Sequence, residues 1–206
     1  IMEGNYFEGN QAQSGGAVFL RGNTRSAETL VANSTFISNV AKGAGGAIYS
    51  NNAVLVIKHA TFDSNFAVGG GHLYTMLSHI DELSNSVLGE VASGSGAGCF
   101  FNSAATIANG TYYPSSMAVC QTGLPGAEAV ADFQVMGVDR SRAIPVLVFS
   151  HQSPVIDGGS NDLCLPVDAH DTARPQDGND DGIAVCDAGA YELVLADRIF
   201  RNGFEE

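Results

Sequence analysis

Short apolar runs alternate with polar turns over the first 90 residues, and one phrase recurs three times, at residues 7–19, 36–49 and 62–74. Each copy has a Phe, an Asn three residues later, a glycine pair and then a second apolar run. The runs are rich in Val, Ile, Phe and Tyr and too short for helices, which is typical of strands. A repeat spaced by 29 and then 26 residues is one supersecondary unit that must stack on its neighbours to bury its apolar face.

Stacking of such units predicts an all-β fold, a single-stranded right-handed parallel β-helix with strands about 4.8 Å apart. Equivalent residues of successive coils then lie on top of one another. The sequence therefore predicts an internal ladder of Phe7, Phe36 and Phe62, and a corner ladder of Asn10, Asn39 and Asn65.

The second run of each copy indicates which side chains point into the coil. His72 replaces an Ala of the other copies and shares a strand face with Tyr74. A histidine inside a narrow apolar coil needs a polar partner, so we expect this face to point outward. Val18, Ile48 and Leu73 would then point inward, and Phe19, Tyr49 and Tyr74 outward. The opposite orientation, with Ala17 and Ala47 inside, stays open.

The pattern divides the chain into three parts. Residues 1–150 are expected to form coils, with clear repeats over 5–90 and irregular coils over 91–150, and with one helical stretch at Ala127–Val135. Residues 151–192 are rich in Asp, Gly and Pro and contain two cysteines, which predicts a loop-rich, disulfide-bonded cap. Residues 193–206 form a C-terminal tail.

Composition narrows the classes of partner. A net charge of −13 argues against binding to a phosphate backbone, so we expect no nucleic-acid partner. No apolar run approaches the roughly 20 residues of a membrane-spanning helix. Ile1 lies inside a repeat, and no signal peptide is visible in the sequence. We therefore expect the C-terminal part of a longer exported protein, whose first coils and export signal are missing here.

The phrase F-x-x-N followed by G-G-A-[IV]-[FY] resembles the repeat of the chlamydial polymorphic membrane proteins and related bacterial surface β-helices. It stands here as Phe7–Phe19, Phe36–Tyr49 and Phe62–Tyr74, the third copy departing at His72. The resemblance implies a secreted or surface-displayed protein, associated with the bacterial outer membrane. Members of this family are often adhesins or autotransporter passengers.

A second resemblance covers about residues 85–192, whose end is similar to the choice-of-anchor Q domain of bacterial β-helix surface proteins. Its motifs stand as Ser153–Gly159, Asp168, Arg174-Pro175 and Cys186–Glu192, with Ala169–Thr172 where D-Q-R-G is expected. The last residues, Asp197–Glu205, are similar to a terminal motif of secreted proteins in Xanthomonas-like bacteria. As parts of a cap, Asp157, Asp168 and Asp187 would accept bonds from loop amides or from Arg174. Tyr191 and Ile156 would cover the open end of the coil.

The four cysteines, Cys99, Cys120, Cys164 and Cys186, favour disulfides in an exported chain. Sequence alone allows three pairings. The local one joins Cys99 to Cys120 and Cys164 to Cys186, each closing a loop of about twenty residues and contributing about 3 kcal/mol. Free buried thiols are the alternative.

Residues 177–182 fit D-x-N-x-D-G, the first half of an EF-hand-type calcium loop. Asp177, Asn179 and Asp181 would supply side-chain oxygens, Ile183 a carbonyl, and Asp187 would substitute for the missing Glu at the twelfth position. The alternative is an acidic surface turn without a metal. We expect no other cofactor.

Catalysis is the remaining hypothesis, because β-helices also serve polysaccharide lyases and hydrolases that use paired carboxylates. The coil holds few acids: Glu3, Glu8, Glu28, Asp63, Asp81 and Glu82. The repeat equivalents of Glu8 are Ile37 and Asp63, so no acidic ladder forms, and His72 and His79 are expected to be exposed. The sequence therefore favours a structural and interaction module, adhesin-like, that binds an unknown surface protein or glycan. The alternative is a carbohydrate-active β-helix with its active coils outside this fragment.

Overall fold

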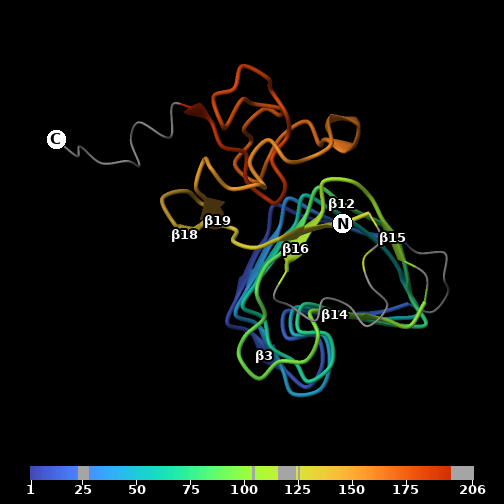
Figure 1. Cartoon of the computed structure of the whole chain (residues 1–206). Coiled ribbons are helices and arrows are strands. Elements are labelled where there is room, and N and C mark those ends of the chain that lie inside the picture. The colour runs from blue at the N-terminus through green and yellow to red at the C-terminus, as the bar shows by residue number, and fades with distance from the viewer. Residues whose placement is uncertain (23–27, 104, 116–123, 125, 196–206) are drawn as a thin grey trace.

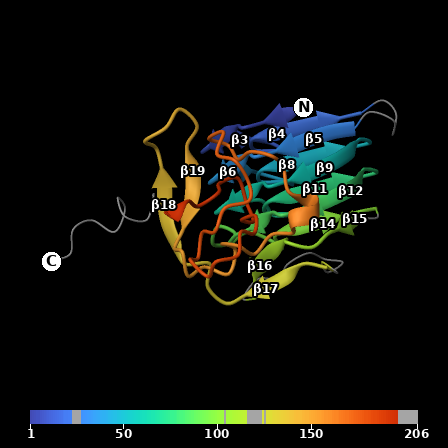
Figure 2. The ribbon, with the colours of Figure 1, turned by 90° about the horizontal axis from the view of Figure 1, so that it is seen from above.

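The computed structural model describes residues 1–22, 28–103, 105–115, 124 and 126–195. Its strands form a parallel β-helix of about four turns, seen along its axis in Figure 1 and from the side in Figure 2. Three parallel sheets, named A, B and D here, form the walls of the coil. A short fourth sheet, C, lies between B and D.

Sheet A contains β1 (Met2–Glu3), β5 (Glu28–Ala32), β9 (Val54–Lys58), β12 (His79–Ser84) and β15 (Ala105–Ile107). Sheet B contains β2 (Tyr6–Glu8), β6 (Thr35–Ile37), β10 (Thr61–Asp63), β13 (Val87–Leu88), β16 (Tyr112–Pro114) and β17 (Glu128–Val130). Sheet D contains β4 (Val18–Arg21), β8 (Ile48–Asn51), β11 (Leu73–Met76) and β14 (Cys99–Phe101). Sheet C pairs β3 (Gln11–Ala12) with β7 (Val40–Ala41).

The repeated phrase stacks in register along the coil. Phe7 pairs with Phe36 and Phe36 with Phe62, and their rings stack with centroids 4.9 Å apart in both contacts. Phe36 and Phe62 are fully buried in the core inside the coil. Each such side chain contributes roughly 1.5–3 kcal/mol by leaving water. This row of rings therefore holds successive coils at a common spacing.

The asparagines stack at the corner where sheet B ends. The Asn39 Nδ2 donates to the Asn65 Oδ1 at 3.0 Å and to the Phe7 carbonyl at 3.0 Å. The Asn39 Oδ1 accepts the backbone N–H and the Nδ2 of Asn10. Each amide thus joins its own coil to the next, which satisfies backbone groups that a corner leaves unpaired.

The chain projects from the coil at this corner as a lobe, formed by residues 9–17, 39–47, 65–72 and 91–98, which contains sheet C. Figure 1 shows the lobe below the coil. The glycine pairs close it. Gly45 has φ +65°, and a Cβ on Gly46 would lie 2.1 Å from the Gly71 carbonyl oxygen, so no larger residue fits there.

The second runs point as the sequence predicts, with Ile48 and Leu73 buried in the coil and Tyr49 and Tyr74 on the outside. The expectation that His72 is exposed is wrong, because His72 is completely buried. Its partner is the corner ladder: the His72 Nδ1 lies 3.1 Å from the Asn65 Nδ2, and the Nε2 lies 2.8 Å from the Gly89 carbonyl oxygen. Both ring nitrogens are satisfied, so the histidine replaces the buried Ala47 of the previous coil.

Beyond β17 the chain leaves the coil. Residues 135–149 form an antiparallel hairpin of β18 (Val135–Asp139) and β19 (Val146–Phe149). The predicted helix at Ala127–Val135 is wrong, because Glu128–Val130 pairs with β16 as the last strand of sheet B. Strand pairing at the end of an existing sheet overrides the weak helical preference of this segment.

The cap, residues 150–195, is mostly loop and contains the 3-10 turn η1 (Asn161–Leu163). The Cys164–Cys186 disulfide crosses it, with Cα atoms 6.2 Å apart. Cys120, the predicted partner of Cys99, lies outside the described residues. The cap and the hairpin lie above and beside the coil in Figure 1, on the side away from the lobe.

The cap covers a side of the coil. We expected Tyr191 and Ile156 to close the open end, and this is wrong: they share a core with Ile37 and Val87, which point outward from sheet B. The Ala190 amide donates to the Thr61 Oγ1 at 3.0 Å. The outer face of sheet B is apolar enough to hold a second core, so the molecule has one core inside the coil and one between coil and cap.

Candidate functional site

Four aromatic rings form a second ladder on the outer face of sheet D, named the outer ladder here. Phe19, Tyr49, Tyr74 and Phe100 stack in that order, with centroids 5.0, 5.4 and 4.7 Å apart and planes within 11° of parallel. Phe19 is 53% exposed and the other three are half-buried. The rings cover one another's faces, so the ladder presents ring edges and the tyrosine hydroxyls to solvent.

The side of the molecule formed by the lobe and sheet D contains no acidic residue. Its segments, residues 9–22, 39–51, 65–78 and 91–103, have neither Asp nor Glu, although the chain has 22 acidic residues. Those of the coil lie on or directly beside sheets A and B: Glu3, Glu8, Glu28, Asp63, Asp81, Glu82, Glu90 and Glu128. We name this region the acid-free side. The segments of this region lack negative side chains, although the chain as a whole has a net charge of −13.

Among the residues that the structure describes, the acid-free side carries two exposed cations, Arg21 and Lys42. Arg21 follows Phe19 on the same face of β4, and its row continues through Asn51 and Met76 in the next two coils. Lys42 lies in the lobe. The lobe touches the ladder, since a Cβ on Gly69 would lie 3.4 Å from the Tyr74 ring. The ladder therefore runs between a row of polar side chains and the base of the lobe.

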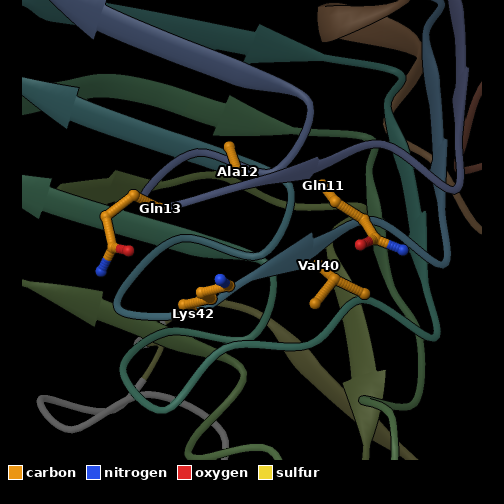
Figure 3. A pocket seen from close by; sticks show the side chains of 5 residues that line it. All are labelled: Gln11, Ala12, Gln13, Val40 and Lys42. Carbon is orange, nitrogen blue, oxygen red and sulfur yellow. The ribbon is translucent and has the colours of Figure 1, made fainter.

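The lobe holds a pocket of about 410 Å³, which lies in the size range of small-ligand sites. Gln11, Ala12, Gln13, Val40 and Lys42 line it. Figure 3 shows Gln13 beside Lys42 at one end and Gln11 beside Val40 at the other. Two amides and an ammonium give this pocket several hydrogen-bond donors and no carboxylate among the lining residues.

A different polar cluster joins the cap to the coil and is buried. Asn33, His59 and Asn85 stack at the corner between sheets A and B, all with positive φ and all at most 2% exposed. The Asn33 Nδ2 donates to the Val167 carbonyl at 3.0 Å, and the Asn85 Oδ1 accepts the Ser160 amide at 2.7 Å. The corner thus binds the cap through polar groups that the sequence analysis did not single out.

Arg174 lies at the centre of this cluster. Its guanidinium donates to the carbonyl oxygens of Asp187 and Gly189 at 3.1 and 2.9 Å and contacts the His59 Nδ1. The Glu192 carboxylate lies 3.4 Å from the Arg174 Nε, an ion pair without a well-oriented hydrogen bond. Burial raises the pKa of Glu192 to about 7, against the attraction of Arg174, and lowers the pKa of Arg174 to about 10. Arg174 and Glu192 form a buried ion pair inside the cap, since no part of either charged group reaches solvent.

The cap aspartates accept backbone amides. The Asp168 carboxylate bonds the amides of His170, Thr172 and Glu192. The Asp187 carboxylate bonds the amides of Asp157 and Leu193 at 2.7 and 2.6 Å. Arg174 does not form a bidentate pair with either of them. The bond from the His170 amide to Asp168 is that of an Asx turn, whereas Asp187 joins segments up to 30 residues apart.

The predicted calcium loop is also held by its own amides. The Asp177 carboxylate accepts the amides of Asp180, Asp181 and Gly182, and the Oδ1 atoms of Asn179 and Asp181 accept the amides two residues onward. Ile183 is 64% exposed, whereas Asp187 is completely buried. Over the described residues no group of three or more His, Cys, Asp or Glu side chains is placed to hold a metal. Calcium binding at this loop stays a prediction.

Three other charged residues of the coil form ion pairs. Glu8 pairs with Arg140 at 2.7 Å on the surface, and Lys58 pairs with Glu82 at 2.8 Å. Ile37 lies between Glu8 and Asp63 in the register of sheet B, as the repeat predicts. His79 lies on sheet A beside Val54. Asp63 has a carboxylate neighbour in Glu90, and its pKa is raised mainly by burial and further by the repulsion of Glu90.

Comparison with known proteins supports the surface-associated class. The Chlamydia polymorphic membrane protein repeat matches residues 33–51, which is the second copy of the phrase. This similarity indicates a bacterial, surface-associated β-helix. No curated protein and no solved structure matches the chain. The described residues include no helix of the length and hydrophobicity that a membrane crossing requires.

Sequence reasoning found three rings of the outer ladder and missed the fourth, Phe100. The signal was present, because Cys99-Phe100-Phe101 alternates as the earlier strands do, but the glycine pair that marks the repeat is absent before it. The sequence also shows that the segments of the acid-free side lack Asp and Glu, but the sheet assignment is needed to place these segments on one side.

Proposed function

We propose that this chain is a secreted or cell-surface interaction module of a bacterium, an adhesin-like β-helix that binds a partner through its acid-free side. The stiff coil would display that side at a distance from the cell. The proposal is supported by the surface-associated class of the matched repeat and by the rigid stacking of both ladders.

The outer ladder is the observation that carries this proposal. Exposed apolar side chains that are contiguous mark interaction sites more often than scattered ones do. Here four aromatic side chains are contiguous, ordered by stacking, and not covered by the described part of the cap, which packs on sheet B. Aromatic side chains with few rotatable bonds lose little entropy on binding, which suits them to an interface.

The cap has a separate role in the proposal. The resemblance of residues 85–192 to choice-of-anchor Q domains supports a position near the attachment point of a longer protein. Calcium at residues 177–183 would stabilise the same cap. Titration with calcium, followed by the melting temperature with and without chelator, tests this second point, and an unchanged melting temperature would count against it.

A binding experiment tests the proposed function. Wild-type chain and the double variant Tyr49→Asp/Tyr74→Asp are labelled and applied to host epithelial cells, extracellular-matrix proteins and a glycan array. We expect wild type to bind at least one of these surfaces and the variant to bind it at least tenfold less. The matched control is His79→Asp, which places the same carboxylate on the outer face of sheet A.

Two outcomes would count against the proposal. One is equal binding by wild type and by the Tyr49→Asp/Tyr74→Asp variant, when circular dichroism shows that both are folded. The other is loss of binding in His79→Asp to the same extent, since the binding surface would then not be the acid-free side.

A further inference from the structure

The chemistry of the acid-free side indicates what kind of ligand it accepts, and this inference rests on the proposed function. Aromatic rings carry a negative face and a positive edge. In the outer ladder, neighbouring rings 4.7 to 5.4 Å apart cover the faces between them, so Tyr49 and Tyr74 in the middle expose their positive edges. Such a surface favours electronegative ligand atoms, such as hydroxyl and carboxylate oxygens, over the apolar face of a sugar ring.

The polar groups around the ladder have the same preference. Arg21 and Lys42 attract carboxylates, and the amides of Gln11, Gln13 and Asn51 bond hydroxyl groups. No acidic side chain in these segments repels an anion. Charge complementarity therefore points to a ligand that carries both hydroxyl groups and negative charge.

The repeat of the coil selects a polymer over a single small molecule. Each turn adds one aromatic ring to the ladder, so rings recur along the axis at the spacing of the coils, while the neighbouring row changes from Arg21 to Asn51 to Met76. A chain of repeating units laid along the ladder would meet an aromatic ring at each turn.

We propose that the acid-free side binds an acidic polysaccharide, a chain of uronic-acid units laid along the outer ladder, with carboxylates at Arg21 and Lys42 and hydroxyl groups at the amides and the tyrosine hydroxyls. The ligand is held without being cleaved by these residues. Binding through two cations is salt-dependent, and it weakens as ionic strength screens them.

Two polysaccharides that differ only in charge provide the test. Polygalacturonate and its fully methyl-esterified, neutral form are titrated into the full chain by isothermal calorimetry at low and at physiological ionic strength. We expect wild type to bind polygalacturonate and to bind the neutral polymer at least tenfold more weakly. Added salt should reduce binding of the acidic polymer and leave that of the neutral polymer unchanged.

Variants locate the binding. Arg21→Gln/Lys42→Gln should lose tenfold or more in affinity for polygalacturonate, and Tyr49→Ala/Tyr74→Ala should lose a similar factor. The matched control is Lys58→Gln, which removes a cation from sheet A and should leave the affinity unchanged. Circular dichroism on each variant checks that the coil is intact.

The outcomes separate this inference from the proposed function. Equal affinity for the charged and neutral polymers, or no effect of Arg21→Gln/Lys42→Gln, overturns the acidic ligand. If the tyrosine variants instead reduce binding to a neutral glycan or a matrix protein, the interaction module stands and the acidic polysaccharide is wrong. If they change binding to no surface at all, both proposals fall.

Discussion

Sheets B and D belong to the same coil, yet the cap covers the outer face of sheet B while the rings on the outer face of sheet D stay partly exposed. The outward row of sheet B has Thr35, Thr61 and Val87 between Tyr6 and Tyr112. The cap backbone approaches the small middle residues and bonds the Thr61 hydroxyl, and the Tyr112 hydroxyl donates to the Gly158 carbonyl. Sheet D presents large rings that stack on one another and stay exposed at their edges. The large residues of sheet B pack against the cap, whereas those of sheet D stack on one another.

Charge follows the same division. The cap beside sheet B is rich in carboxylates, many of which bond loop amides, whereas the lobe and sheet D have none. Covering a face with this cap therefore also makes that side of the molecule acidic. The uncovered face keeps the two cations that an anionic partner requires.

An aspartate introduced on each of the two outer faces should give the largest difference in the free energy of unfolding. Val87→Asp buries an unpaired carboxylate between sheet B and the cap, where Val87 is 0% exposed, and should cost more than about 4 kcal/mol or prevent folding. Tyr74→Asp on sheet D places the same group at the surface and should cost about 1 kcal/mol, mainly from lost ring stacking. Urea unfolding measures both. Equal losses would mean that sheet D is covered as fully as sheet B.

Removal of the Arg174 guanidinium should give the second-largest loss of stability. Arg174→Met leaves two carbonyl oxygens without donors and Glu192 without its cation, and should lower the free energy of unfolding by about 3 kcal/mol. The control is Arg140→Met, whose ion pair with Glu8 lies on the surface and should contribute little. Thermal melting of both variants decides the matter, and similar small shifts would contradict the role assigned to Arg174.

Loss of the disulfide tests how far the cap depends on a covalent link. Cys164→Ser/Cys186→Ser opens a loop of 22 residues and should cost about 3 kcal/mol, because the unfolded chain gains entropy. We expect the cap to become sensitive to protease while the coil stays resistant. The stacked rings of Phe7, Phe36 and Phe62 inside the coil do not involve either cysteine. Cleavage of coil and cap at equal rates would show that the two regions unfold together.

The smallest effect concerns pH. Burial raises the pKa of Glu192 from 4.5 to about 7, so the folded state holds this proton more tightly than the unfolded chain does. The stability from this group is full below about pH 4.5 and is lost as pH rises through about 7. Wild type should lose on the order of 1–2 kcal/mol between about pH 5 and 8, and Glu192→Gln should flatten that slope. Urea unfolding across this range is the measurement, and parallel profiles would rule out Glu192 as the cause.

The sequence by itself determined the coil. A repeat of Phe, Asn and paired glycines predicts which side chains stack, because each coil can bury its apolar face only against an equivalent coil. It predicted the inward direction of Ile48 and Leu73 and the alternation that places Tyr49 and Tyr74 outside. It did not place His72, because the buried partner, Asn65, is seven residues away and meets it only across the lobe.

Tertiary structure alone decided where the cap lies and what it leaves bare. The cap has no repeat, and its contacts join residues more than a hundred positions apart, such as Thr61 with Ala190 and Asn33 with Val167. Local patterns carry no information about such contacts. Whether a side of the coil is core or binding surface therefore depended on the folded chain, although the residues that suit sheet D to a partner were present in the sequence.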